Sequence, residues 1–152
     1  MQLVPIEQTG TALSSALTAG SVAADVVAAT VALYARRGYE VPWIGYLAKE
    51  GSEYIGGCGF AGPASRGEAE IAYYTFPGHE GRGVATEMAG ELLRISRQAA
   101  TEADVRFIAH TLPEEGASTS VLRKLGFVLQ GVILHPEDGK VWKWSESERS
   151  EA

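Results

Sequence analysis

A glycine-rich stretch ahead of the longest helical pattern constrains this chain more than any other feature of its sequence. Three glycines in six positions, Gly78, Gly81 and Gly83, allow a tight turn with positive φ and a close approach by a ligand. Residues 82–103 carry apolar side chains at helical spacing, so the turn leads into the start of a helix. The first N–H groups of a helix are unpaired and lie at the positive end of its dipole. The sequence therefore predicts an anion-binding loop suited to phosphate.

Hydrophobic periodicity and turn residues predict a mixed fold of strands and helices. Strands are expected at 1–6, 43–49, 54–60, 68–75, 105–112, 128–134 and 140–144, and helices at 9–19, 21–37, 82–103 and 117–125. Short turns separate the three strands between 43 and 75, which predicts an antiparallel meander. Because the 152 residues contain no linker or second core, one domain is expected over residues 1–145, followed by a polar tail at 146–152.

Composition and charge limit the classes of function. The chain is 45% hydrophobic and 21% charged, which is typical of a soluble globular protein. A net charge of -6 disfavours general nucleic-acid binding and leans toward cationic partners such as amines. No apolar run predicts a membrane helix, and the first residues do not resemble a signal peptide. The single cysteine, Cys58, cannot form an internal disulfide, so a cytoplasmic location is expected.

Two nucleotide-binding motifs do not fit the chain. Residues 57–62 match G-x-G-x-x-G, but they continue into Pro63 and a further turn, where a dinucleotide-binding motif requires a helix. The loop at Gly78 lacks the lysine of a mononucleotide-binding P-loop, since Val84 follows its last glycine. The loop therefore needs a different phosphate-containing ligand.

The loop and a second motif together resemble the GNAT superfamily of N-acetyltransferases. The segment IAYYTFP at 71–77, followed by EGRGVATE at 80–87, is similar to the acetyl-CoA loop of that superfamily. The segment AHTLPEEGASTSVLRKLGF at 109–127 resembles the second motif of the branch that contains the ribosomal-protein N-terminal acetyltransferases. The resemblance covers nearly the whole chain. It implies an α+β fold with a mixed, mostly antiparallel sheet of six to seven strands flanked by about four helices.

The resemblance also implies a reaction and a cofactor. The expected enzyme transfers acetyl from acetyl-CoA directly to a primary amine, either a small molecule or a peptide N-terminus. Backbone at the end of the strand before the loop would bind the pantetheine arm, and main-chain N–H groups of the loop would hold the pyrophosphate. The implied cofactor-binding residues are Tyr74, Thr75, Gly81, Arg82, Gly83, Val84, Ala85, Thr86 and Ser118. A homodimer through the C-terminal strands is a further implication.

Two residues are the catalytic candidates. Glu70 matches a glutamate of the branch's E-I-G-Y pattern and is predicted to act through water as the base that deprotonates the amine. Glu68 shares its face of the strand and is the alternative base, while a solvated structural carboxylate stays equally open for Glu70. Ser118 matches the motif serine and is predicted to contact the thioester sulfur or relay a proton. A helix-capping role is equally open for Ser118.

Three positions depart from the family pattern. Glu80 stands at the head of the loop, where the superfamily usually has Arg or Gln, and its charge would not favour a pyrophosphate. Glu115 replaces an asparagine that would contact the cofactor, and Leu122 replaces the tyrosine that protonates the leaving thiolate. These departures leave an alternative open, a non-catalytic acyl-CoA sensor or degenerate relative with the same fold.

The histidines and the cysteine receive minor roles. His110 is a possible base, but a structural role is favoured for it, and His79 and His135 lie in predicted turns. The scattered histidines show no metal-ligand spacing, so no metal site is predicted. Cys58 has no adjacent base and is expected to be a small buried side chain rather than a nucleophile.

Aromatic residues after the second helix suggest the acceptor pocket. Tyr34, Tyr39 and Trp43 are the predicted substrate-binding residues, in a region that also contains the charged residues Arg36, Arg37 and Glu40. Trp142 and Trp144 are the alternatives, although large aromatic side chains more often serve packing.

Overall fold

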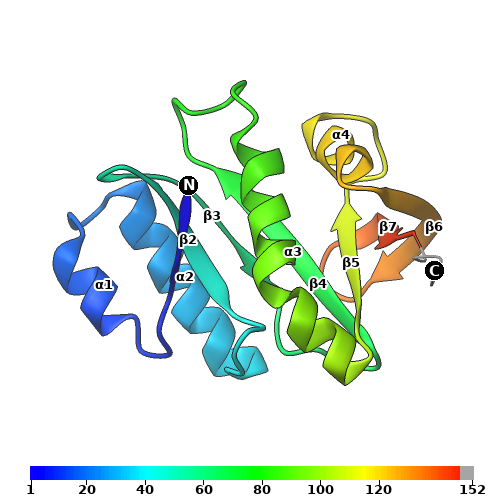
Figure 1. Cartoon of the computed structure of the whole chain (residues 1–152), viewed down its shortest axis with the longest axis horizontal. Helices are drawn as coiled ribbons and strands as arrows, with labels where there is room; N and C mark the ends of the chain where they lie inside the picture. The colour runs from blue at the N-terminus through cyan, green and yellow to red at the C-terminus, as the bar shows by residue number, and fades with distance from the viewer. Residues whose placement is uncertain (148–152) are drawn as a thin grey trace.

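Seven strands form one sheet in the order β1-β2-β3-β4-β5-β7-β6 in the computed structural model, which describes residues 1–147 (Figure 1). The strands are β1 (Gln2–Pro5), β2 (Gly45–Glu50), β3 (Glu53–Phe60), β4 (Glu68–Thr75), β5 (Arg106–Thr111), β6 (Phe127–His135) and β7 (Gly139–Glu146). The helices are α1 (Thr11–Ala16), α2 (Val22–Arg37), α3 (Val84–Ala103) and α4 (Ala117–Lys124). This α+β architecture confirms the fold class that the sequence predicted.

The sheet opens between β4 and β5, which are parallel neighbours. All neighbouring strands run antiparallel except β4 and β5, which pair at the start of each strand only. The three pairs are Glu68–Arg106, Ala69–Phe107 and Glu70–Ile108. Farther along, β5 continues to pair with β7, while β4 keeps β3 as its partner. The two strands therefore diverge toward their C-terminal ends, as Figure 1 shows.

Two helices approach opposite faces of β3 closely because its glycines leave room. A Cβ atom on Gly56 would lie 2.9 Å from Sδ of Met88 in α3, and one on Gly57 would lie 3.1 Å from Cγ1 of Val26 in α2. Successive strand residues face opposite sides of a sheet, so α2 and α3 cover opposite faces. The G-x-G-x-x-G match begins in this strand and opens no helix, which confirms that it is not a dinucleotide-binding motif.

Most element boundaries differ from the predicted ones by one to three residues, as at α1, α3 and β7. Helix α1 ends at Ala16, before the predicted residue 19. Helix α3 begins at Val84 rather than at residue 82, because the preceding Gly83 adopts a left-handed conformation with φ of 75°. Strand β7 extends to Glu146, whose carboxylate accepts hydrogen bonds of 2.9 and 2.8 Å from Arg97 of α3. The rest of the predicted tail, residues 148–152, lies outside the described residues.

No helix within residues 1–147 combines the length and the apolar character that crossing a membrane requires.

Candidate active site

The loop between β4 and α3 has the conformation that its glycines predict. Gly78, Gly81 and Gly83 all have positive φ, and a Cβ atom at any of the three would meet no other atom within 4 Å. Glu80 turns back onto the loop, where its Oε1 accepts a 3.0 Å hydrogen bond from the N–H of Gly78. Arg82 donates a 2.8 Å hydrogen bond to the carbonyl oxygen of Gly78. These two hydrogen bonds thus stabilise the turn, and Glu80 also lines a cavity beside it.

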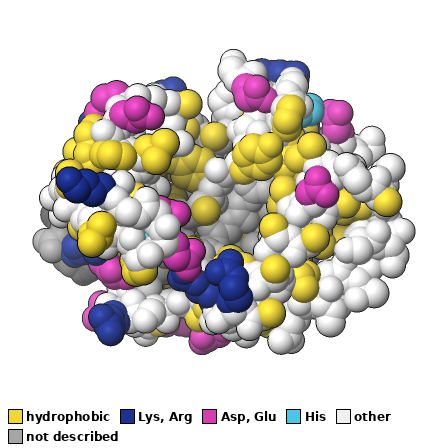
Figure 2. Space-filling model, turned by 180° about the vertical axis from the view of Figure 1, so that it is seen from behind, with side chains coloured by type: hydrophobic (Ala, Val, Ile, Leu, Met, Phe, Trp, Pro, Cys, Tyr) yellow, Lys and Arg dark blue, Asp and Glu magenta, His cyan; other side chains and the backbone are white. Residues whose placement is uncertain are grey.

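A cavity of about 510 Å³ lies between this loop, the end of β4 and the starts of α3 and α4. Figure 2 shows the hollow from behind, between the part of the surface over the loop and the part over α4. The cavity brings together all the predicted cofactor residues except Arg82, namely Tyr74, Thr75, Gly81, Gly83, Val84, Ala85, Thr86 and Ser118. Lys124, which the sequence reasoning missed, also lines it and supplies a cationic side chain. Two helix N-termini therefore meet at a cavity suited to phosphate groups.

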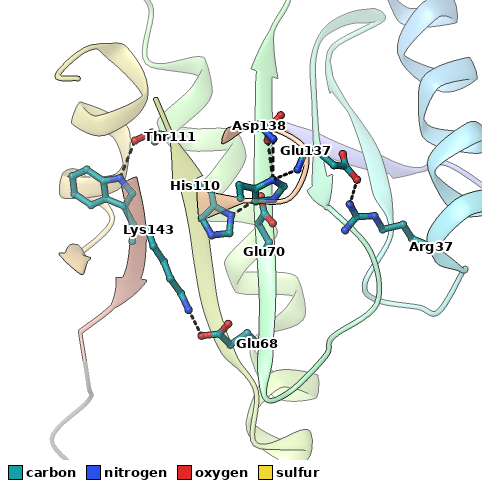
Figure 3. Close-up of polar contacts among 10 residues, drawn as sticks. Arg37, Glu68, Glu70, His110, Thr111, Glu137, Asp138 and Lys143 are labelled. Atoms are coloured by element: carbon teal, nitrogen blue, oxygen red, sulfur yellow. Dashed lines mark hydrogen bonds and ion pairs between the residues drawn. The ribbon is translucent and has the colours of Figure 1, made fainter. Parts of the chain in front are cut away.

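A second cavity, of about 530 Å³, lies beside the start of β4. It is lined by Arg36 and Arg37 at the end of α2, by residues 61–65, and by Glu68, Glu70 and Ile108. Both arginines pair with Glu137 of the β6–β7 turn, so the charges at its rim are partly compensated. Figure 3 shows the pair of Arg37 and Glu137.

A smaller space of about 140 Å³ lies in the opening between β4 and β5, and we call it the passage. Residues 70–73, residues 109–111 and Ser118 line the passage. Tyr73 and Ser118 also line the cavity at the loop, whereas Glu70 also lines the cavity beside α2. The three spaces therefore follow one another through the opening in the sheet.

Glu70 faces His110 across the passage. Nδ1 of His110 lies 3.1 Å from Oε2 of Glu70, and the side chains are 10% and 26% exposed (Figure 3). Both ring nitrogens of His110 are buried, and neither has a hydrogen-bond partner among residues 1–147. The ring of His135, at the end of β6, lies 5.2 Å from that of His110. The fold thus gathers two histidines and a glutamate, although their positions in the sequence did not suggest a cluster.

Glu68, the alternative base, is engaged elsewhere. Its Oε2 accepts a 2.8 Å hydrogen bond from Nζ of Lys143 in β7 (Figure 3). The carboxylate of Glu70 forms no ion pair with a lysine or arginine among residues 1–147, so no such side chain competes with the substrate amine for it. Geometry therefore favours Glu70 over Glu68 as the base.

Ser118 stands in the first turn of α4 without capping it. The residue that precedes this helix is Gly116, whose N–H donates a 3.0 Å hydrogen bond to Oγ1 of Thr119. The hydroxyl of Tyr73 donates a 3.0 Å hydrogen bond to the carbonyl oxygen of Ser118, and burial raises the pKa of Tyr73 to about 12. Tyr73 is a site residue that the sequence reasoning missed, although its place beside Tyr74 on the strand before the loop was a signal. Leu122 is fully buried.

Glu115, another departure from the family pattern, pairs with Arg123 of α4 and accepts a hydrogen bond from Thr119. Its carboxylate is thus held at the start of α4.

The aromatic residues predicted to bind the acceptor lie in the core instead of lining these cavities. Tyr34 is buried, donates to the carbonyl oxygen of Ile6 and accepts from the N–H of Gly45. Trp43 is also buried and packs edge-on against Phe60, with ring centroids 5.0 Å apart. Tyr39 packs edge-on against Tyr34. Their position supports a packing role, so the acceptor proposal below uses other residues.

Two further side chains stay outside the chemistry. Cys58 is buried, and burial raises the pKa of its thiol to about 12, which disfavours a nucleophilic thiolate. Trp144 is buried and its indole N–H donates a 3.0 Å hydrogen bond to Oγ1 of Thr111, so it fixes β7 against β5.

Comparison with known proteins identifies the class of this protein. Residues 13–128 match the family model described as acetyltransferase (GNAT) domain, which covers more than half of the chain. The chain therefore belongs to this family and is an acetyl-CoA-dependent N-acetyltransferase. No curated protein sequence matches it.

Solved structures share the fold at low sequence identity. A chimera of the spermidine N-acetyltransferase SpeG from Vibrio cholerae and hSSAT is 15% identical, with a TM-score of 0.67 over 95% of this chain and 93% of that one. The ribosomal L7/L12 α-N-protein acetyltransferase RimL, in complex with coenzyme A, is 19% identical, with a TM-score of 0.66 over 95% and 92%. A ribosomal-protein-alanine N-acetyltransferase from Brucella melitensis is 17% identical, with a TM-score of 0.62 over 96% and 99%.

Proposed function

We propose that this acetyltransferase binds acetyl-CoA in the cavity at the β4–α3 loop and its acceptor amine in the cavity beside α2. The thioester and the amine would meet in the passage. The observation that carries this proposal is that Tyr73 and Ser118 line the passage and the first cavity, while Glu70 lines the passage and the second. Acetyl transfer then takes place directly, in a complex that contains both substrates.

The residues of the passage supply the proton transfers. Glu70 accepts a proton from the ammonium group through water, and the neutral amine attacks the thioester carbonyl. The tetrahedral intermediate breaks its carbon–sulfur bond and releases CoA thiolate, and the nitrogen passes its remaining excess proton to water. The hydroxyl of Tyr73, beside Ser118, gives a proton to the thiolate and regains one from water. Tyr73 thereby takes the place of the family tyrosine that is absent at Leu122.

The acceptor that suits the second cavity is a small amine or the end of a peptide chain. A volume of about 530 Å³ holds a ligand of that size rather than a folded domain. Glu68 and Glu70 line one part of this cavity and favour a cationic amine. Arg36 and Arg37 line another part and favour an acceptor that also carries a carboxylate or a peptide carbonyl. Similar structures include enzymes named for spermidine and for a ribosomal-protein N-terminus.

An amine panel tests this function. Thiol release from acetyl-CoA is measured with polyamines, amino acids and short peptides, and acetyl-CoA binding is measured separately by calorimetry. We expect turnover with at least one amine, and Glu70→Gln should lower kcat by about 100-fold or more while acetyl-CoA still binds. Binding without turnover on any amine would favour the acyl-CoA sensor, and absence of binding would contradict the cofactor site.

A cytoplasmic homodimer is the assembly that we propose. The lone cysteine is a free thiol, as a reducing compartment allows. Strand β6 forms the edge of the sheet and exposes Val128, Val132 and Leu134, which are 49%, 58% and 78% exposed. Exposed apolar residues on an edge strand favour pairing with a second chain. Light scattering should show a dimer that Val132→Lys converts to a monomer, and a monomeric unmodified chain would contradict it.

A further inference from the structure

We propose that Glu70, His110 and His135 bind a Zn²⁺ ion in the passage. The three residues come from β4, β5 and the end of β6. One potential ligand atom of each lies within 4.8 Å of the others, although more than twenty residues of sequence separate neighbouring members. Such a separation needs only a small adjustment of the side chains to place all three atoms about 2.0–2.2 Å from one ion.

The burial of His110 without a hydrogen-bond partner in the described part of the chain indicates that its ring binds a ligand. Its side chain is 10% exposed, and both ring nitrogens are buried without a hydrogen-bond partner among residues 1–147. A buried polar group without a partner costs free energy, so such groups are rare in folded proteins. Nδ1 of His110 lies 3.1 Å from Oε2 of Glu70, a contact that is an ion pair only when the ring is protonated, and Nε2 has no partner among residues 1–147. A cation that contacts both atoms would satisfy the nitrogen and the carboxylate together.

The chemistry of the three side chains selects zinc. Two imidazoles and one carboxylate form the ligand set of several zinc sites that keep a fourth position open. That position would face the passage, where water can occupy it. Mg²⁺ and Ca²⁺ prefer sites made of oxygen ligands, so a set with two nitrogens disfavours them.

Residues of the β6–β7 turn contact the ring of His135 and hold its orientation. Nδ1 of His135 accepts hydrogen bonds from the N–H groups of Glu137 and Asp138, at 3.2 and 3.3 Å, and Oδ2 of Asp138 lies 3.4 Å from it. These contacts leave Nε2 as the atom that binds the ion. Zinc binding at Nε2 requires the ring proton on Nδ1, so the two backbone N–H groups must give up their bonds to Nδ1, and Asp138 accepts the Nδ1 proton in their place. Asp138 is then the positioning residue of a carboxylate–histidine–zinc arrangement.

The nearby basic side chains leave room for the ion. Lys143 pairs with His110 across the strands, but its Nζ is bound to Glu68 at 2.8 Å. Arg36 and Arg37 are held by Glu137. Zinc in this position would engage the carboxylate that we propose as the base, so zinc should inhibit acetyl transfer. This inhibition rests on the proposed function, whereas zinc binding does not.

Cobalt absorption tests binding without reference to activity. The full chain, freed of metal by a chelator, is titrated with Co²⁺, whose visible absorption reports four-coordinate nitrogen and oxygen ligands. We expect one Co²⁺ per chain, displaced by Zn²⁺ and unaffected by Mg²⁺. His110→Ala, His135→Ala and Asp138→Asn should each weaken binding by about tenfold or more. His79→Ala removes the remaining histidine of the chain and should leave the Co²⁺ spectrum unchanged.

Circular dichroism shows which variants are folded, and His135→Ala and Asp138→Asn lie at a turn where folding is least at risk. The proposal is wrong if the chain gives no Co²⁺ spectrum, or if the spectrum persists in folded His135→Ala. Inhibition is measured with an amine that the panel identifies, and half-inhibition of His135→Ala should need about tenfold more Zn²⁺. A chain that binds Co²⁺ but has no turnover would contradict the proposed function and leave the zinc site standing.

Discussion

The hydroxyl of Tyr73 donates a 3.0 Å hydrogen bond to the carbonyl oxygen of Ser118 and so joins β4 to α4 across the opening in the sheet. Because burial raises the pKa of Tyr73 to about 12, its hydroxyl keeps its proton throughout the neutral range. A protonated hydroxyl in the passage is what a departing thiolate requires.

Removing this hydroxyl should slow the chemistry more than it weakens binding. Tyr73→Phe keeps the ring and removes the proton donor, so we expect kcat to fall by about 100-fold, in the range of general acid catalysis. The dissociation constant of acetyl-CoA should change by less than about twofold. Steady-state thiol release and calorimetry measure the two quantities.

Tyr54→Phe is the matched control, because Tyr54 lies at the start of β3, outside the cavities described above. A Tyr73→Phe enzyme with the same kcat as the control would exclude Tyr73 as the acid and leave Ser118 as the next candidate.

Glu80 contributes a hydrogen bond to the loop but also a negative charge beside the proposed pyrophosphate site. Glu80→Gln keeps an oxygen that can accept from Gly78 and removes the charge. One unit charge at about 4 Å in water is worth about 1 kcal/mol, so coenzyme A should bind up to about fivefold more tightly. Calorimetry at low and high salt should show the gain shrinking with salt. Weaker binding by the glutamine variant would mean that the charge itself orders the loop.

Gly83 combines positive φ with an open side where a ligand can approach. Gly83→Val places a branched side chain in that space and adds strain of about 1–2 kcal/mol. We expect the variant to fold and to lose coenzyme A binding in calorimetry. Gly139→Val is the control, since Gly139 also has a positive φ, of 74°, with no atom within 4 Å of a Cβ, but lies at the start of β7. Equal loss of binding in both variants would show a general effect of strain.

Cys58 should make the fold sensitive to alkali. Burial raises the pKa of its thiol to about 12 in the folded chain, above the value of about 8.5 expected when the chain is unfolded. The folded state therefore favours the protonated thiol, and this contribution is complete below the unfolded pKa and lost as pH rises toward the folded one.

We expect Tm to fall as pH rises from about 9 to 11, and Cys58→Ala to reduce the fall by removing one of the buried acids. Tyr46 and Tyr73, whose pKa values burial raises to about 12, and Tyr34, whose pKa burial also raises, should contribute to the remainder. Differential scanning calorimetry gives the Tm values. An identical pH dependence in the alanine variant would show that the thiol does not contribute.

Local patterns in the sequence predicted the order of strands and helices because periodicity and turn residues are properties of neighbouring positions. The loop at Gly78 was predictable for the same reason. The cluster of Glu70, His110 and His135 was not, because it depends on which strands become neighbours in the sheet. The pairing of β4 with β5, and the return of β6 and β7 beside β5, bring the three together.

The sequence also did not reveal the direction in which side chains point. Tyr34 and Trp43 were expected at the acceptor because aromatic residues concentrate there, but their rings point into the core and bond or pack within it. The sequence also showed the charge of Glu80 without its hydrogen bond to Gly78, which depends on the conformation of the loop.

Three residue pairs join β4 to β5, so the sheet consists of two parts that are connected at the start of these two strands. One part contains β1 to β4 and the other β5 to β7, and beyond the three pairs no strand within residues 1–147 lies beside the facing edge of β4. A pantetheine arm that forms hydrogen bonds with this edge of β4 would connect the two parts of the sheet. Because a ligand that binds only the folded state stabilises it by about 2.7 kcal/mol at 100 times its dissociation constant, the free energy of unfolding of this enzyme would rise and fall with the supply of acetyl-CoA.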